Sequence, residues 1–188
     1  TIMVEAISRD ITAKIEVDEK LEKVLQNLKD LSDQYTIELQ NSQKQLLDII
    51  DFLPDATYVV DVDNNIIAWN HAMVTMSGIV KSLAIGRPYQ DIIKSFYKNN
   101  KPILIELMAS NSEDIDTKNQ EITINNGVIS IERYFPDLND GAGGHAWISA
   151  AAILDNEKNY AGAVESIRDI TPIKTVEKSI RETEQRLS

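Results

Sequence analysis

The sequence contains no cysteine, which excludes disulfide bonds, thiolate metal sites and every mechanism that depends on a thiol. It has only two histidines and no run of about 18 apolar residues that could span a bilayer. Basic residues are also outnumbered: the formal net charge is −11 and the isoelectric point is about 4.6. Nucleic-acid backbones and anionic membrane surfaces attract clustered Lys and Arg, so neither is an expected partner.

Proline and glycine are absent from residues 11–50, so nothing in this stretch interrupts a helix. Apolar residues recur there in alternating steps of four and three, which is the a/d pattern of a coiled coil. The pattern, which we call the seam, runs through Leu21, Leu25, Leu28, Ser32, Tyr35, Leu39, Ser42, Leu46 and Ile49. We expect Thr12 to cap this helix and residues 13–50 to pair with a second copy as a parallel homodimer. The alternative is a single amphipathic helix that lies on its own domain.

A short motif occurs twice, each time after a Val-Glu pair and before a helical pattern. Arg9, Asp10, Ile11 and Thr12 recur in the same order as Arg168, Asp169, Ile170 and Thr171. A self-match at a long offset indicates a repeated unit. We therefore expect residues 1–12 to be the tail of a preceding unit in a longer polypeptide. Residues 172–188 would begin an outgoing helix, with Pro172 in its first turn and its own apolar seam.

The residues between the two helical stretches have the pattern of an α+β domain. Strands are expected over 57–62 and 66–69, and a helix over 71–77, with Asn70 as its N-cap and Gly78 at its end. Short helices are expected near residues 81–83 and 89–93, a longer one from Pro102, and further strands over 121–124, 128–131, 146–149 and 160–167. Asn125, Asn126 and Gly127 form a hairpin-turn sequence. We expect a single antiparallel sheet with helices on one face.

Several fragments in this order resemble the PAS domain family. They are the runs 52–56, 60–61, 67–72, 77–79, 85–89 and 91–93, followed by 155–156, 162–165 and 169–171. The resemblance implies a PAS domain over residues 51–171, with a five-stranded antiparallel sheet and a ligand cleft between sheet and helices. It also implies coiled-coil linkers to output domains. Two features depart from the family: a proline common in the penultimate strand is absent at residues 150–152, and the loop 137–144 is rich in glycine.

Cofactor chemistry known from this family finds little support in the residues. The flavin photosensors need a thiol, which the chain lacks, and the haem sensors use a histidine on the helix after Pro102, where residues 102–111 contain none. His71 and His145 are expected to be surface or packing residues without nearby carboxylates, hence a poor metal site. Acidic pairs such as Asp61 with Asp63 suit turns. No catalytic triad, phosphate loop or phosphoacceptor histidine is present, so any kinase would lie beyond residue 188.

Three residues are candidates to line the ligand cleft: Met108, Arg133 and Trp147. Arg133 could bind an anionic ligand, or could face outward and pair with an acid. Met108 and Trp147 suit an apolar pocket, although core packing explains them equally well. At the end of the domain, Thr171 is expected to cap the outgoing helix while Asp169 bonds back to the sheet.

These observations lead to one functional hypothesis and one alternative. The chain is expected to be a sensory and dimerisation module of a cytoplasmic multi-PAS signalling protein, of the sensor histidine kinase type. A small ligand or partner would tilt the sheet, and the Asp169–Thr171 junction would pass the change into the outgoing helix. The alternative is a structural PAS domain with an empty cleft, which only spaces and dimerises its neighbours. Neither reading makes the fragment an enzyme.

Overall fold

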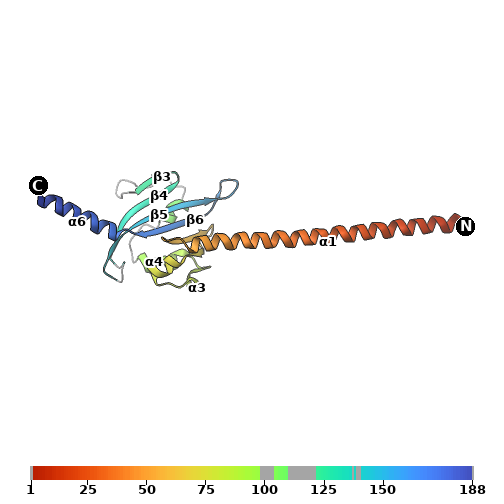
Figure 1. Cartoon of the computed structure of the whole chain (residues 1–188), viewed down its shortest axis with the longest axis horizontal. Helices are drawn as coiled ribbons and strands as arrows, with labels where there is room; N and C mark the ends of the chain where they lie inside the picture. Colours follow the sequence, from red (N-terminus) through yellow and green to blue (C-terminus); the bar gives the residue numbers. More distant parts are fainter. Residues whose placement is uncertain (1, 98–103, 110–121, 137, 139–140, 188) are drawn as a thin grey trace. The chain divides into compact units, whose positions relative to one another are not determined.

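The computed structural model describes residues 2–97, 104–109, 122–136, 138 and 141–187 (Figure 1). The chain divides into two compact units, Thr1–Leu47 and Asp48–Ser188. Helix α1 (Ile2–Asp51) supplies the first unit and the first residues of the second. The second unit contains the sheet, the short helices and the C-terminal helix α6 (Thr171–Leu187).

Helix α1 begins well before residue 13, so the prediction that Thr12 is its N-cap is wrong. The two copies of the repeated motif differ at the next position. Pro172 follows Thr171 and disfavours the helical conformation of the residue before it, whereas Ala13 follows Thr12 and favours a helix. The assignment of residues 1–12 to a preceding unit stays a prediction.

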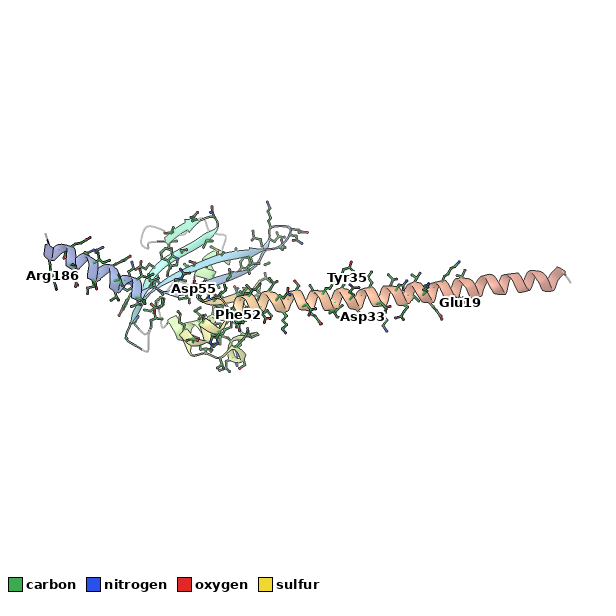
Figure 2. The ribbon with its side chains drawn as sticks, in the orientation of Figure 1. Glu19, Asp33, Tyr35, Phe52, Asp55 and Arg186 are labelled. Atoms are coloured by element: carbon green, nitrogen blue, oxygen red, sulfur yellow. The ribbon has the colours of Figure 1, made fainter. Side chains whose placement is uncertain are left out.

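The apolar side chains of the α1 seam are exposed. Leu21 is 55% exposed, Leu28 57% and Leu39 61%. Tyr35 is 64% exposed and projects from the helix (Figure 2). Burying such side chains is worth about 1.5–3 kcal/mol each. An unpaired α1 therefore leaves a large apolar area in water.

The domain is α+β, and its described residues form six antiparallel strands in the order β2-β1-β6-β5-β4-β3. The strands are β1 (Ala56–Asp61), β2 (Ile66–Trp69), β3 (Ile122–Asn125), β4 (Val128–Phe135), β5 (Gly144–Leu154) and β6 (Tyr160–Asp169). Figure 1 shows β3 to β6 side by side. The resemblance implied five strands, one too few. The sixth, β3, pairs with β4 through the predicted hairpin, where Asn126 and Gly127 take positive φ angles of 49° and 77°.

In the part of the chain that the structure describes, four short helices lie between β2 and β3 in the sequence. They are α2 (His71–Ser77), α3 (Lys81–Ala84), α4 (Tyr89–Tyr97) and α5 (Leu104–Ala109). Asn70 is the N-cap of α2, and Gly78 ends it in the left-handed conformation, both as predicted. Helix α2 packs on β1, and α5 packs on β5 and β6. The longer helix expected from Pro102 is described only over α5.

Alternate residues of the strands face the helices and form the core. One row across the sheet joins Ile131, Ile148 and Ile167 to Ala56, and all four are buried. The opposite, outer face carries a row of hydroxyls instead: Thr57, Ser166, Ser149 and Ser130. The outer pairs are hydrogen-bonded, Thr57 to Ser166 at 3.2 Å and Ser130 to Ser149 at 3.0 Å. The sheet therefore has one apolar face and one partly polar face.

Two hairpin turns are built on an aspartate that accepts backbone hydrogen bonds. Asp61 Oδ1 accepts from the amides of Asp63 and Asn65, at 3.0 and 2.8 Å. Asp155 repeats the arrangement in the β5–β6 turn, where the amide of Asn159 and further bonds lower the pKa of its carboxyl. Both aspartates therefore stabilise turns, as the sequence predicted.

Helix α6 leaves the end of β6 and has hydroxyl residues at every fourth position. Thr175, Ser179 and Thr183 each donate a hydrogen bond to the carbonyl four residues earlier, at 2.9, 3.0 and 2.8 Å. Its apolar residues, Ile173, Val176 and Ile180, are 54–59% exposed. This helix therefore repeats the exposed seam of α1 on a smaller scale.

Candidate functional site

The space between the sheet and the helices is filled by large side chains. Tyr58, Trp69 and Tyr89 are at most 1% exposed. The rings of Tyr58 and Trp69 lie 5.8 Å apart, and Trp69 Nε1 donates a hydrogen bond of 3.0 Å to the carbonyl of Ile79. A ligand that entered this region would have to displace or reorient these aromatic rings.

A carboxylate lies within this apolar region. Glu165 of β6 is 0% exposed and stands opposite Tyr58 of β1 in the sheet. The Tyr58 hydroxyl donates a hydrogen bond of 3.0 Å to Glu165 Oε1. Burial raises the pKa of Tyr89, and the charges of Glu106 and Glu165 add to the rise. A buried acceptor among apolar side chains can recognise a hydrogen-bond donor or a cation.

A groove of about 960 Å³ lies between the segment before β1, helix α2 and the end of β6. Its lining includes Phe52, Leu53, Pro54, Ala56, Ala72, Met76, Leu138 and Ile167, together with Asp51, Asp55, His71, Thr75, Arg168 and Asp169. The wall therefore combines apolar side chains with almost as many polar and charged ones. The groove reaches Asp169, the first residue of the predicted junction.

Asn70 holds the segment that forms one wall of the groove. Its side chain is 1% exposed. Oδ1 accepts hydrogen bonds from the amides of Met73 and Thr57, and Nδ2 donates to the carbonyls of Leu53 and Asp55. The same residue therefore caps α2 and fixes the chain before β1.

A bidentate ion pair joins two residues of the groove lining, Asp55 and Arg168. Arg168 Nε lies 2.9 Å from Asp55 Oδ1, and Arg168 Nη2 lies 2.6 Å from Asp55 Oδ2. Figure 2 shows Asp55 on the segment before β1. The carboxylate of Asp55 raises the pKa of the Arg168 guanidinium. The pair ties the start of the domain to its last strand, next to the junction.

The two residues of the predicted junction bond to different partners. Asp169 Oδ1 accepts a hydrogen bond of 2.8 Å from the amide of Thr171, so Asp169 caps the start of α6. The Thr171 hydroxyl bonds to the sheet instead: its oxygen accepts from the His145 amide at 2.8 Å. The amide of Ile170 also donates to the His145 carbonyl, at 2.8 Å. The prediction that the Thr171 hydroxyl caps the helix is wrong, because this hydroxyl bonds to the backbone of His145 on β5. The predicted bond from Asp169 back to the sheet stays a prediction.

The ligand-cleft candidates do not gather at one place. Met108 on α5 is partly buried and packs against the core. Arg133 shares a strand face with the buried Ile131 and Phe135, so it does not face outward. Trp147 lies on the outer face, because its neighbours Ala146 and Ile148 are the buried ones, and it is 38% exposed. The prediction that Trp147 lines the interior is therefore wrong.

The two histidines also differ from each other. His71 is exposed at the start of α2. His145 is partly buried, and its Nδ1 lies 3.3 Å from Glu132 Oε1, so the expectation that it lacks a carboxylate neighbour is wrong. Among the residues that the structure describes, no group of three or more His, Asp or Glu side chains is placed to hold a metal ion. No described helix is long and apolar enough to cross a membrane.

Sequence reasoning did not single out Glu165, Tyr58, Asn70 or Glu132 as site residues. A signal for Glu165 was available, because strand alternation places it on the same face as Ala163 and Ile167. An acid at a core position is uncommon and marks a site for closer study. The partner, Tyr58, is far away in sequence and could be identified only once the strands were paired.

Comparison with known proteins identifies related folds. A family model described as PAS domain matches residues 54–172. Among solved structures, the PAS domain of a protein from Colwellia psychrerythraea is 23% identical, with 69% of this chain and 98% of that chain covered and a TM-score of 0.43. A sensory box sensor histidine kinase from Vibrio cholerae is 12% identical, with 73% and 98% covered and a TM-score of 0.41. An RNA-binding light-oxygen-voltage receptor is 12% identical, with 80% and 38% covered and a TM-score of 0.51. No curated protein matches the chain.

Proposed function

The chain belongs to the PAS domain family, and on this premise we propose that it is a sensory and dimerisation module of a signalling protein. In this proposal a change in the sheet passes through the Asp169–Thr171 junction into helix α6. The module itself has no catalytic role. It works inside a larger cytoplasmic protein of the sensor histidine kinase type, whose output domain carries the activity.

The attachment of α6 to the sheet carries this proposal. Ile170 and Thr171 bond to His145 on β5, while Asp169, the last residue of β6, caps the helix. The start of α6 therefore depends on two neighbouring strands at once. A small shift of β5 along β6 would change both sets of bonds and so the direction or rotation of the helix.

The exposed seams support dimerisation through a second copy of this chain. The α1 seam keeps steps of three and four over nine positions, which suits a partner helix of the same sequence. Ser32 and Ser42 interrupt it and would weaken the pairing locally. The residues Ile173, Val176 and Ile180 of α6 repeat the pattern. We assign both helices to a parallel homodimer.

Two places in the domain could receive the signal. The buried Glu165 with Tyr58 offers a hydrogen-bond acceptor inside the sheet–helix layer. The groove beside Asp169 offers apolar contacts and lies against the junction. A small molecule with an apolar body and a donor group or positive charge fits either description.

Native mass spectrometry of the purified chain tests the proposal. We expect a dimer, and a bound small-molecule mass when the protein is prepared from cells that make the ligand. Leu28→Glu places a charge in the seam and should give a monomer, whereas Asn27→Glu, one position outside the seam, should leave the dimer intact. A wild-type chain that stays monomeric at high concentration would contradict dimerisation. A dimer that never carries an added mass would favour the spacer alternative.

A further inference from the structure

A carboxylate on the outer face of the sheet joins three elements. Glu132 lies on β4, and its side chain is 26% exposed. Its Oε2 lies 2.7 Å from Nζ of Lys174 in the first turn of α6, and its Oε1 lies 3.3 Å from Nδ1 of His145 on β5. This acid of β4 therefore contacts both strand β5 and the outgoing helix.

The contact with Glu132 is better placed than the other ion pair of the same lysine. Lys174 Nζ lies 3.8 Å from Glu177, whose side chain is 60% exposed and which belongs to the same helix. A shorter pair with a less exposed acid is screened less by water and salt. The Glu177 pair cannot orient α6, because both residues move with the helix. The Glu132 pair can, because it joins the helix to the sheet.

His145 connects the Glu132–Lys174 contact to the junction between β6 and α6. Its backbone bonds to Ile170 and Thr171, and its ring contacts Tyr134 of β4 edge-on at 5.2 Å between centroids. The junction hydrogen bonds described above join β5 and β6 to α6. Glu132 and Tyr134 bring β4 into contact with the same residues.

We propose that Glu132 is a positioning residue that sets the direction in which α6 leaves the sheet. The inference rests on the proposed relay and extends it to a third strand. Its neighbour Arg133 lies on the opposite, helix-covered face of β4. A ligand that displaces β4 from the inner side would move Glu132 on the outer side, and Lys174 would carry that movement into the helix.

The absence of cysteine allows a direct test by site-directed spin labelling. Labels at Asp63→Cys, in the β1–β2 turn, and Arg181→Cys, on α6, report the direction of the helix relative to the sheet. Labelled chains are diluted with unlabelled chains so that distances within one copy dominate. Double electron–electron resonance should give a narrow distance distribution for the otherwise wild-type protein.

Glu132→Gln and Lys174→Gln should each cause loss of the narrow peak, with similar broad distributions. The exchanged pair Glu132→Lys with Lys174→Glu should restore it, because the attraction is kept with the signs reversed. Glu177→Gln is the matched control and should keep the narrow peak, since it removes only the bond within the helix. Circular dichroism and thermal unfolding identify the variants that remain folded.

An unchanged distribution in a folded Glu132→Gln or Lys174→Gln variant would overturn the proposal. So would equal broadening in Glu177→Gln, or no recovery in a folded exchanged pair. Failure of the proposed function would be distinguished by native mass spectrometry, where a monomeric chain contradicts dimerisation whatever the direction of α6.

Discussion

The hydroxyl of Tyr58 donates a hydrogen bond of 3.0 Å to Oε1 of Glu165, and both side chains are fully buried. The two residues are direct neighbours on antiparallel strands β1 and β6. They are 107 positions apart in the sequence. The stability of the fold depends on the hydrogen-bond donors to this buried acid. If a donor is removed, the cost of taking the acid out of water remains without the compensating hydrogen bond.

We expect Tyr58→Phe to lower the free energy of unfolding by about 1–3 kcal/mol, because it removes the donor and leaves the acid in place. Glu165→Gln keeps an acceptor at Oε1 and should lower it less. Urea unfolding at neutral pH measures both. A loss in Glu165→Gln greater than in Tyr58→Phe would show that another contact of Glu165 dominates.

We expect the ionisation of Tyr89 to lower the free energy of unfolding as the pH rises in the alkaline range. Its pKa is raised in the folded protein, first by burial, so folding favours the neutral phenol. This contribution is complete below the unfolded-state pKa of about 10 and is lost as the pH rises above it. Between pH 9 and 11, unfolding free energies should therefore fall less steeply in Tyr89→Phe than in wild type.

At pH 7 the phenol of Tyr89 is neutral in both the folded and the unfolded state, so the difference in unfolding free energy between Tyr89→Phe and wild type at that pH gives the cost of losing the hydroxyl alone. Equal slopes for Tyr89→Phe and wild type would contradict the assignment.

Asn70 should tolerate no simple replacement. Asn70→Asp keeps the acceptor for Met73 and Thr57 but loses the two donor bonds to the carbonyls of Leu53 and Asp55. We expect each of Asn70→Asp and Asn70→Ala to cost at least about 1–3 kcal/mol, because buried groups lose their partners. Thermal unfolding measures the loss. His71→Ala, at the next and exposed position, should have a small effect.

We expect a side chain at position 162 to destabilise the fold, because the backbone of Gly162 lies close to the backbone of Val60 on β1. Its φ is +152°, and a Cβ at this position would lie 3.2 Å from the carbonyl carbon of Val60 and closer still to its oxygen. Backbone atoms in a paired strand cannot move aside cheaply, so Gly162→Ala should cost about 1–3 kcal/mol for crowding alone. Gly86→Ala, where no atom lies within 4 Å, should cost only the positive-φ strain. Similar losses for the two variants would argue against the close approach.

Asp169→Ala should loosen the first turn of α6. Its carboxylate accepts the Thr171 amide, and loss of a helix cap costs about 0.5–2 kcal/mol. Hydrogen exchange should become faster for the amides of residues 173–176. Thr175→Val, which removes only a hydroxyl bond on the exposed side of the helix, is the comparison. If the hydrogen-exchange rates of these amides did not change in Asp169→Ala, the carboxylate of Asp169 would not be the group that stabilises the first turn of α6.

Features governed by local backbone chemistry could be predicted from the sequence. Asn70 and Gly78 mark the ends of α2 because one supplies a short acceptor and the other adopts positive φ. Asn126 and Gly127 mark the β3–β4 hairpin for a similar reason. The start of α1 was predicted wrongly, at Thr12, because the motif there is followed by Ala13 and not by a proline such as Pro172. Without that proline, nothing stops the helix from extending to residues before Thr12.

The candidate site was harder to predict because its contacts join distant strands. Glu132 meets Lys174, and Arg168 meets Asp55, only after β4, β5, β6 and the segment before β1 have come together. The side of the sheet on which Trp147 lies follows from the exact register of β5, and a shift of one residue would reverse it. Residue type alone could not decide between interior and exterior.

The line of hydroxyls along α6 bears on how this helix can carry a signal. Side chains that bond to the carbonyl one turn earlier weaken the backbone ladder on their side and favour curvature. If the start of α6 at Thr171 were displaced perpendicular to the helix axis, bending along the helix would reduce the displacement before Leu187. In the proposed relay, rotation of α6 about its own axis would survive such bending, so rotation is the movement that we expect to reach the end of the helix.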